Sequence, residues 1–247
     1  MKERLFGLFL AMLVVVLAMT VPLTVSAQNR AWNLELTPYL WFAGIDADIT
    51  AGGRTGTVDV GFDDLFDYVD VAGGLLVIAE YNRWLLWVQG DLMSLDSSNE
   101  NTRFDELGKV ELDLKILETA VGYSFHNPLS ARGRIDALIG FRYTDIETKF
   151  KPATGGSFSS ENDFLDVMLV LRPSFAITEK LFFNPTLAVG TGDSDLVYEL
   201  QPQFEYKFTD NLVGRIGYRR LYYDIEGDRG EFDGVLHGVI LGVGWTF

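Results

Sequence analysis

The chain has 247 residues but contains no cysteine and only two histidines. Without cysteine there can be no disulfide, no thiol nucleophile and no thiolate metal site. Two histidines leave little material for a zinc centre or for imidazole-based catalysis. We therefore expect no bound metal and no cofactor, and the composition favours no class of enzyme.

Long hydrophobic runs are absent as well, with one exception at the N-terminus. Residues 5–21 are apolar, follow two basic residues, and lead to a Val-Ser-Ala sequence that ends at Ala27. A basic start, an apolar centre and a small-residue exit are typical of a secretory signal peptide. We predict a signal peptide at 1–27 and a mature domain at 28–247. An uncleaved anchor helix is the alternative, since about 20 apolar residues span a bilayer.

Basic residues are scarce relative to acidic ones. The chain has 20 Lys and Arg against 35 Asp and Glu. Removing residues 1–27 takes away two basic residues and one acidic residue, which leaves 18 against 34 and a net charge of −16. Because such a chain repels phosphate, we predict no nucleic acid partner.

No long stretch of the mature chain shows sustained helical periodicity, whereas two-residue alternation recurs in short segments separated by turn residues. The last segment alternates most clearly. One face carries Val235, His237, Val239, Leu241, Val243, Trp245 and Phe247, and the other carries Gly234, Leu236, Gly238, Ile240, Gly242, Gly244 and Thr246. We predict ten strands, near residues 33–49, 71–81, 84–95, 109–125, 133–147, 163–176, 180–191, 196–208, 212–226 and 234–247.

Connections of two lengths alternate along these strands. Those at Asn82-Arg83 and at Thr209-Asp210-Asn211 are tight, whereas those at 50–70, 96–108 and 148–162 are long. Transmembrane β-barrels have this asymmetry, with short periplasmic turns and long external loops. The sequence thus predicts an all-β protein, a transmembrane antiparallel up-and-down β-barrel of about ten strands, with eight or twelve as alternatives. A soluble β-sandwich or a lipocalin-like barrel would also alternate, but with its apolar side chains inside.

The C-terminal sequence LHGVILGVGWTF resembles the β-signal of outer-membrane barrels, in which spaced apolar residues precede a terminal aromatic residue. The matching positions are Val239, Leu241, Val243, Trp245 and Phe247. As a pattern, the mature chain is similar to small Gram-negative outer-membrane barrels of the OmpA-type or OmpW-type class. The resemblance implies localisation in the bacterial outer membrane, contact with its lipid and lipopolysaccharide, and assembly by the barrel-assembly machinery. It implies no biochemical activity.

Charged side chains recur on the faces that we predict to point into the barrel. They are Glu118, Asp136, Arg142, Asp166, Arg172, Glu199, Glu205, Arg215 and Arg219. A ten-stranded barrel is only slightly wider than the eight-stranded barrels that side chains nearly fill, and buried charges need partners, so we expect arginine and carboxylate to pair there. The lumen is then either a packed, salt-bridged plug or a narrow polar pore that selects solutes. Glycines on the inner face of the last strand leave room for long side chains opposite, which slightly favours the plug.

Features outside the lumen suggest three further interpretations. Residues 62–70, FDDLFDYVD, have helical spacing and can form a short amphipathic helix that covers or gates the external end.

External acidic residues could hold divalent cations that bridge to lipopolysaccharide phosphates. These residues are Asp46, Asp48, Asp59, Asp63, Asp64, Asp67, Asp228, Glu231 and Asp233. A lipid-modifying enzyme would need a nucleophile beside His126 or His237, but His237 has no acidic or serine partner on its own strand and no GxSxG sequence occurs.

We therefore predict an outer-membrane barrel without enzymatic activity, either structural or porin-like in passing small solutes. The alternatives are a closed scaffold that binds lipopolysaccharide and, less favoured, a lipid-modifying enzyme.

Deleting Phe247 should impair assembly, because it removes the terminal aromatic residue of the segment that resembles the β-signal. Outer-membrane fractions from cells expressing the deleted and full chains, compared by the heat-dependent gel shift of folded barrels, would measure the effect. Normal folding and insertion without Phe247 would count against a membrane barrel.

Overall fold

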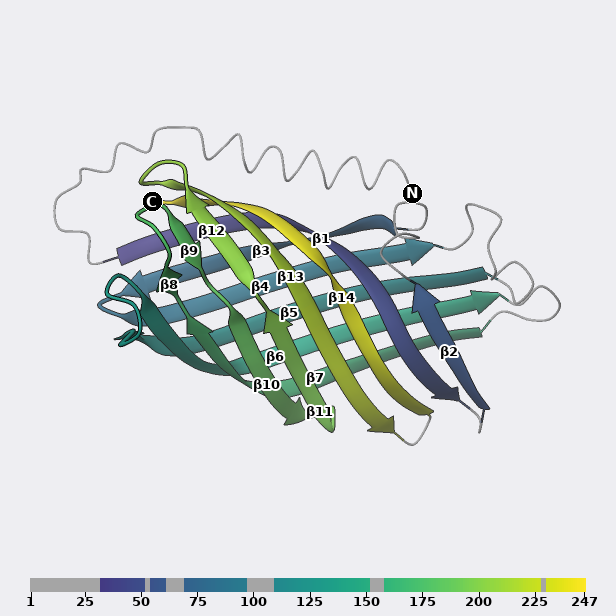
Figure 1. Ribbon diagram of the computed structural model, residues 1–247. Coiled ribbons are helices and arrows are strands. Elements are labelled where there is room, and N and C mark those ends of the chain that lie inside the picture. Colours follow the sequence, from purple (N-terminus) through teal and green to yellow (C-terminus); the bar gives the residue numbers. More distant parts are fainter. Residues whose placement is uncertain (1–31, 52–53, 61–68, 97–108, 152–157, 228–229) are drawn as a thin grey trace.

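The described residues form one antiparallel sheet that closes on itself as a barrel (Figure 1). The structure is a computed structural model that describes residues 32–51, 54–60, 69–96, 109–151, 158–227 and 230–247. The predicted signal peptide, positions 62–68 of the predicted loop helix, and Asp228 lie outside these residues. In the described part of the chain, no helix has the length and apolar character needed to cross a membrane.

Ten antiparallel barrel strands follow one another in chain order, three of them interrupted. They are β1 (Trp32–Ala51), β3 (Val69–Tyr81), β4 (Trp84–Asp96), β5 (Lys109–His126), β6 (Arg134–Lys151), β7 (Phe158–Pro173) with β8 (Phe175–Ala176), β9 (Leu181–Phe183) with β10 (Thr186–Gly192), β11 (Leu196–Gln201) with β12 (Gln203–Lys207), β13 (Leu212–Gly227) and β14 (Gly230–Thr246). β14 pairs with β1, which closes the ring. The predicted ten-stranded up-and-down barrel is confirmed.

A proline accounts for one interruption. Pro202 separates β11 from β12 because proline has no N–H for the strand ladder. Its carbonyl still accepts a hydrogen bond from the Tyr218 N–H at 3.0 Å, so β11 and β12 follow one line beside β13.

The connections differ from the prediction at the end that carries the long loops, which we call the loop end. The stretch 50–70 is not one loop, because β2 (Arg54–Val60) pairs with the outer part of β1 and Val69 and Asp70 already belong to β3. The hairpin of β6 and β7 also continues to Phe150 and Phe158, and β14 begins at Gly230. Backbone pairing extends these strands past the apolar alternation from which their ends were predicted.

At the opposite end, which we call the turn end, the tight connections are as predicted. Asn82 and Arg83 join β3 to β4 with positive φ angles of 48° and 73°. Two successive residues in the left-handed region are characteristic of the type I′ turn, whose twist matches that of a two-residue hairpin.

The outward face of the barrel is apolar. Leu169, Ile139 and Ile216 are 58%, 54% and 54% exposed, and similar side chains surround the barrel. Aromatic pairs lie near the turn end, including Trp84 with Tyr123 at 5.4 Å between ring centroids. A soluble barrel does not expose a continuous apolar band of this kind, whereas a lipid-facing barrel requires one.

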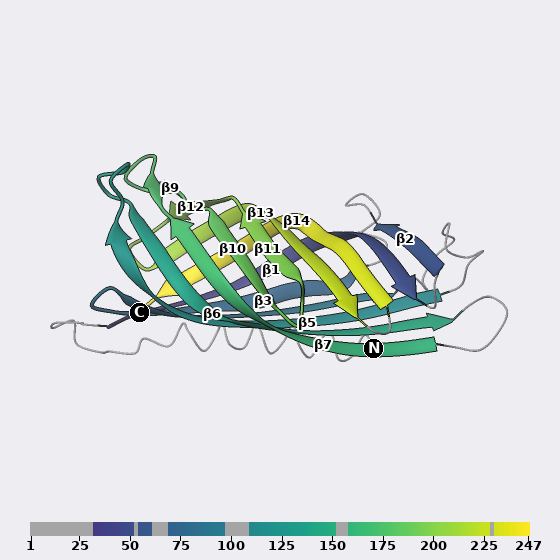
Figure 2. The same cartoon turned by 90° about the horizontal axis from the view of Figure 1, so that it is seen from below.

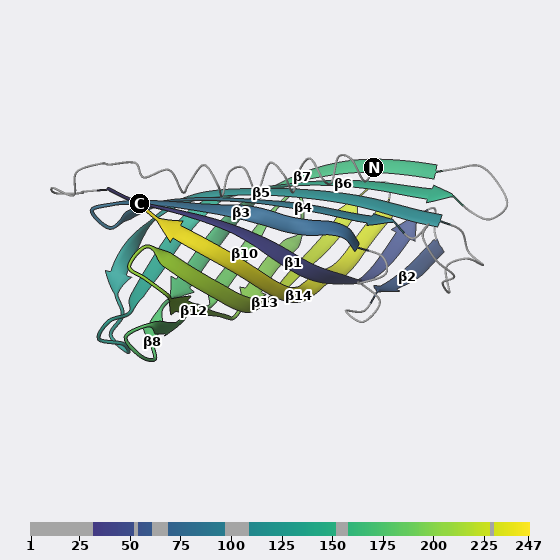
Figure 3. The ribbon, with the colours of Figure 1, turned by 90° about the horizontal axis from the view of Figure 1, so that it is seen from above.

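The wall of the barrel is uneven at the loop end. Residues 158–165 of β7 pair with β6, but β10 ends at Gly192, opposite Asp166. Figures 2 and 3 show β5, β6 and β7 running past the ends of β10 and β11.

Gly238 lies where β14 packs closely on β1, and we predict that Gly238→Ala destabilises the barrel. An added Cβ would stand 1.6 Å from the carbonyl oxygen of Phe42, so the backbone must shift. We expect a loss of about 1–3 kcal/mol in the free energy of unfolding, the usual cost of overpacking. Urea titration followed by tryptophan fluorescence measures it.

Gly90→Ala is the control, because its added Cβ would meet only the Ile116 carbonyl oxygen at 4.0 Å. Equal losses in the two variants would show that the close approach at Gly238 does not matter.

Candidate functional site in the barrel lumen

All nine charged residues predicted to face inward do so in the structure. Eight of them are buried, namely Glu118, Asp136, Arg142, Asp166, Glu199, Glu205, Arg215 and Arg219, and the side chain of Arg172 is 11% exposed. Strand alternation brings them inside, because each lies in phase with buried neighbours on its own strand.

Four of these buried charges form, together with the buried Asp91, a chain that crosses the lumen. Arg219 on β13 contacts Asp91 on β4 and Glu199 on β11, both at 2.9 Å. Arg142 on β6 contacts the same Glu199 and also Glu118 on β5, both at 2.5 Å. The order Asp91, Arg219, Glu199, Arg142, Glu118 alternates in sign, so each arginine lies between two carboxylates. We call these residues the ion chain.

Aromatic side chains support the end of the ion chain near β1. The Tyr39 hydroxyl donates a hydrogen bond to Asp91, and the Arg219 guanidinium lies 4.6 Å above the ring of Trp41. Gly74 makes space for the phenol, since a Cβ there would stand 2.5 Å from the Tyr39 hydroxyl. A cation over an aromatic face adds an attraction that strengthens when water is excluded.

A second group of charges lies nearer the turn end. Arg215 contacts Glu35 at 2.6 Å and Glu205 at 2.9 Å, and it donates a hydrogen bond to the Thr37 hydroxyl at 2.8 Å. Asn184 donates a further hydrogen bond to Glu205 at 3.2 Å.

A third group links β3, β6 and β7. Asp136 lies 3.4 Å from Arg134 and 3.6 Å from Arg172, and Arg134 also contacts Glu80 at 2.7 Å. The guanidinium of Arg172 lies 4.1 Å above the ring of Trp87. Arginine is well suited to this double use, because its planar group binds carboxylates at its edge and aromatic rings on its face.

Asp166 has no arginine partner among the described residues. It accepts hydrogen bonds from the backbone N–H and the hydroxyl of Ser194, both at 2.9 Å. Ser194 belongs to the short connection between β10 and β11, so Asp166 fixes that connection across the end of β10.

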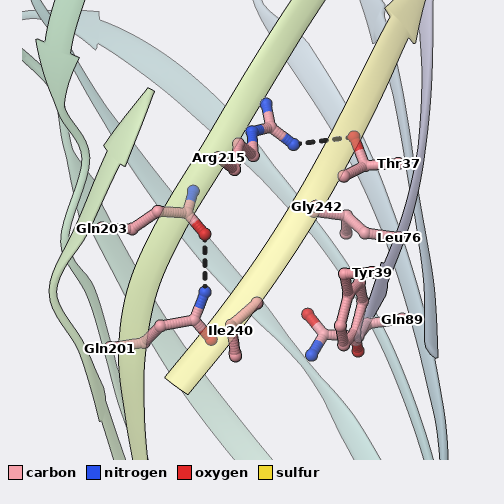
Figure 4. Close-up of a pocket in the computed structure, with 9 residues that line it drawn as sticks. All are labelled: Thr37, Tyr39, Leu76, Gln89, Gln201, Gln203, Arg215, Ile240 and Gly242. Atoms are coloured by element: carbon pink, nitrogen blue, oxygen red, sulfur yellow. Dashed lines mark hydrogen bonds between the residues drawn. The ribbon is translucent and has the colours of Figure 1, made fainter. Parts of the chain in front are cut away.

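A small cavity lies between Tyr39, which donates to the ion chain, and Arg215 (Figure 4). It is lined by Thr37, Tyr39, Leu76, Gln89, Gln201, Gln203, Arg215, Ile240 and Gly242, and the volume open to the centres of water molecules is about 20 Å³. That volume holds one or two waters, which the amide and hydroxyl groups can bind.

Apolar side chains occupy the lumen beside these charges. Trp41, Met168, Val197, Leu221 and Tyr223 are at most 1% exposed and belong to one buried cluster. The Tyr223 hydroxyl lies 2.7 Å from that of Thr144, so its polar end also has a partner. The interior is therefore filled by ion pairs and by apolar packing together.

Several members of these groups were missed from the sequence. Glu35, Glu80, Asp91 and Arg134 face inward in phase with residues that alternate correctly, so strand alternation could have found them. For Glu35, β1 obscured the pattern because this strand has large apolar residues on both faces, with Leu40 outward and Trp41 inward.

His237 has partners that its own strand does not supply. Its Nδ1 lies 2.6 Å from the hydroxyl of Tyr218 on β13, and its Nε2 lies 3.0 Å from the carboxylate of Asp46 on β1. In a neutral ring, Nε2–H donates to Asp46 and Nδ1 accepts from Tyr218, because an ionised carboxylate can only accept. These three residues face outward.

The predicted acidic cation site gains no support from the described residues. Within them, no group of three His, Asp or Glu side chains could hold a metal ion. Asp46 is bound to His237. Asp63, Asp64, Asp67 and Asp228 lie outside the described part of the chain, as do the side chains of Asp48, Asp59 and Glu231.

Solved structures of bacterial outer-membrane proteins have a similar fold. The outer membrane protease OmpT of Escherichia coli is 11% identical, with a TM-score of 0.55 over 90% of this chain and 100% of that chain. A major outer membrane protein of Thermus thermophilus is 13% identical with a TM-score of 0.41, covering 83% and 99% of the two chains. Neisserial surface protein A is 9% identical with a TM-score of 0.38, covering 88% and 98%.

No protein-family model matches the sequence, and no curated protein matches it significantly. At such low identity the likeness to OmpT establishes the fold alone. The chain is thus an outer-membrane-type β-barrel, as predicted.

Replacing Arg142 with Met should strongly destabilise the barrel, because Glu118 would be left buried without its arginine and Glu199 would lose one of two. We expect a loss of about 3–5 kcal/mol in the free energy of unfolding, the usual cost of breaking a buried ion pair from one side. Urea titration of the refolded protein in lipid vesicles measures this loss.

Lys115→Met provides a matched control on the same two strands. Lys115 on β5 pairs with Asp145 on β6 at 3.4 Å, but outside the barrel and largely exposed, so its loss should cost at most about 1 kcal/mol. The double variant Glu118→Leu with Arg142→Met should lose less than Arg142→Met alone. Equal losses in the free energy of unfolding for Lys115→Met and Arg142→Met would show that the buried ion chain stabilises the barrel no more than an exposed ion pair does.

Proposed function

We propose that the protein is a closed scaffold of the bacterial outer membrane and not a channel for solutes. The observation that carries this proposal is the ion chain, which runs across the lumen from Asp91 on β4 through Glu199 on β11 to Glu118 on β5. A polar pore keeps its charges on the wall around a water column. Here the arginines reach across the space that a solute would need.

The packing around the ion chain supports the same proposal. Met168, Leu221 and Tyr223 are fully buried inside the barrel, where a water-filled channel would keep lumen side chains hydrated. The cavity beside Tyr39 and Arg215 has room for water alone. A solute could pass only if several paired charges separated together, and each separation would leave a buried charge without a partner.

The exterior supports a position in lipid. Apolar side chains cover the strands between the aromatic residues of the turn end and the first outward charges near the loop end, such as Lys115, Asp145 and Asp46. A bilayer accommodates this band, since exposed apolar surface is favourable there and unfavourable in water. The scaffold would then present its loop end, with β2 and the long β5–β7 wall, outside the cell.

Planar bilayer recording tests the closed lumen. The refolded wild-type protein should give no stable, salt-dependent conductance steps. A variant with Tyr39→Ala, Arg142→Ser and Arg219→Ser should conduct, because these changes remove the side chains that cross the lumen. Stepwise conductance by the wild type would make the protein a porin and defeat the proposal.

Lys115→Ser serves as the control for the bilayer experiment, because it removes a charge from the outer surface and leaves the lumen intact. The heat-dependent gel shift shows which preparations are folded, so a silent but unfolded sample is not counted.

A further inference from the structure

The apolar band ends, on four neighbouring strands, in a set of polar and aromatic side chains that point outward. The strands are β11, β13, β14 and β1, of which β13, β14 and β1 lie side by side at the front of Figure 1. The set is Tyr198, Tyr218, Arg220, Tyr222, His237 and Asp46. We call it the outer-edge cluster.

The position of the outer-edge cluster along the strands matches a lipid headgroup region. On β13 the outward residues change from Ile216 to Tyr218 and then to Arg220, and on β14 Val239 is followed by His237. Tyrosine and arginine concentrate at this depth because their apolar parts contact acyl chains while their polar ends reach the headgroups.

Arg220 is the informative member of the outer-edge cluster. It donates a hydrogen bond to the Tyr198 hydroxyl, and its guanidinium lies 5.7 Å from the centre of that ring. Within the described residues no carboxylate lies within 4 Å of it, whereas the outward Lys115 has Asp145 at 3.4 Å. Arg220 is therefore a partly exposed cation at the membrane boundary without a neutralising partner from the described chain.

Of the nearby carboxylates, two already have other partners, and Asp224 lies further along the same outward face of β13, beyond Tyr222. Asp46 binds His237, and Asp233 hydrogen-bonds Tyr222. Asp46 lies on β1 and Asp233 on β14, both on the side of β13 away from Tyr198. An anion can thus approach Arg220 from the β11 side without meeting these two carboxylates.

The tyrosines hold Arg220 in place. Tyr198 and Tyr222 stack with ring centroids 4.8 Å apart and ring planes 25° apart, so the ring that contacts Arg220 is fixed by a second ring. An arginine held by one hydroxyl keeps most of its N–H donors free, and these match the paired oxygens of a phosphate.

We propose that Arg220, supported by Tyr198 and Tyr222, binds the phosphate group of a lipid in the outer leaflet. The inference rests on the proposed position in the membrane, but it does not depend on whether the lumen is closed. The site is specific for lipid, since acyl chains would lie against the adjoining apolar surface at Leu200 and Ile216.

Lipid titration followed by native mass spectrometry tests the proposal. The full barrel in dodecyl maltoside micelles would be titrated with dioleoyl phosphatidic acid and, separately, with dioleoylglycerol, which has no phosphate. We expect one phosphatidic acid to bind the wild type preferentially, about tenfold weaker binding to Arg220→Gln, and no dependence of dioleoylglycerol binding on residue 220.

Three further measurements make the result decisive. Lys115→Gln should bind like the wild type, because its cation is already paired. Tyr198→Phe removes only the hydroxyl and should weaken binding several-fold, which keeps the test available if Arg220→Gln folds poorly. Inorganic phosphate at about 100 times the lipid concentration should not displace the lipid. An excess of this size would reveal free phosphate that binds up to about 100-fold more weakly than the lipid.

Unchanged binding in a folded Arg220→Gln, or an equal loss in Lys115→Gln, overturns the proposal. Displacement by inorganic phosphate overturns the lipid as the ligand and assigns the site to a free anion. Bilayer recording on the same preparations separates this inference from the proposed function. Conductance by the wild type would contradict only the closed scaffold. A wild type that does not prefer phosphatidic acid over dioleoylglycerol would contradict only the site at Arg220.

Discussion

The ion chain is the constraint on which the rest of the barrel depends. A charge buried inside a narrow ring of ten strands needs an opposite charge or hydrogen-bond donors, and most of these charges find an opposite charge on another strand. Arg219 on β13 finds Asp91 on β4, and Arg142 on β6 finds Glu199 on β11. These contacts tie together strands that do not pair with each other, and they hold the two sides of the barrel at a fixed distance.

The same contacts specify the strand registers. Shifting β13 by one residue would turn Arg215 and Arg219 into the lipid and bring Ile216 and Tyr218 inside, because side chains alternate along a strand. Small residues complete this arrangement. Gly74 leaves space for the phenol of Tyr39 that donates to Asp91, and a Cβ at Gly242 would stand 3.1 Å from the Tyr39 Cβ, so both positions favour a small residue. Packing and charge pairing therefore depend on each other.

Strand alternation allowed the number of strands, the inward charges and the tight turns to be predicted from the sequence. Alternation is a local property, because a few residues are enough to identify the apolar and the polar face of a strand. Most partners of the charges are not local. Asp136 pairs with Arg172 on β7, Asp166 binds Ser194, and Arg142 takes its carboxylates from β5 and β11.

Pairs that cross a lumen depend on the tilt of the strands and on their stagger around the ring, which no single segment reveals. The strand β2 was missed for a related reason. Its residues pair with the outer part of β1 beyond the apolar band, where hydropathy no longer distinguishes a strand from a loop.

The two sides of the barrel wall use arginine in opposite ways. Inside, Arg142, Arg215 and Arg219 are each bound by two carboxylates, so their charges hold the structure and are not available to a ligand. Outside, the carboxylate of Asp46 is taken by His237, a residue 191 positions away in the sequence, and Arg220 is left with a tyrosine. Because these inner arginines are bound to carboxylates, the proposed function leaves recognition to the outer surface, at the depth where the apolar band gives way to polar side chains.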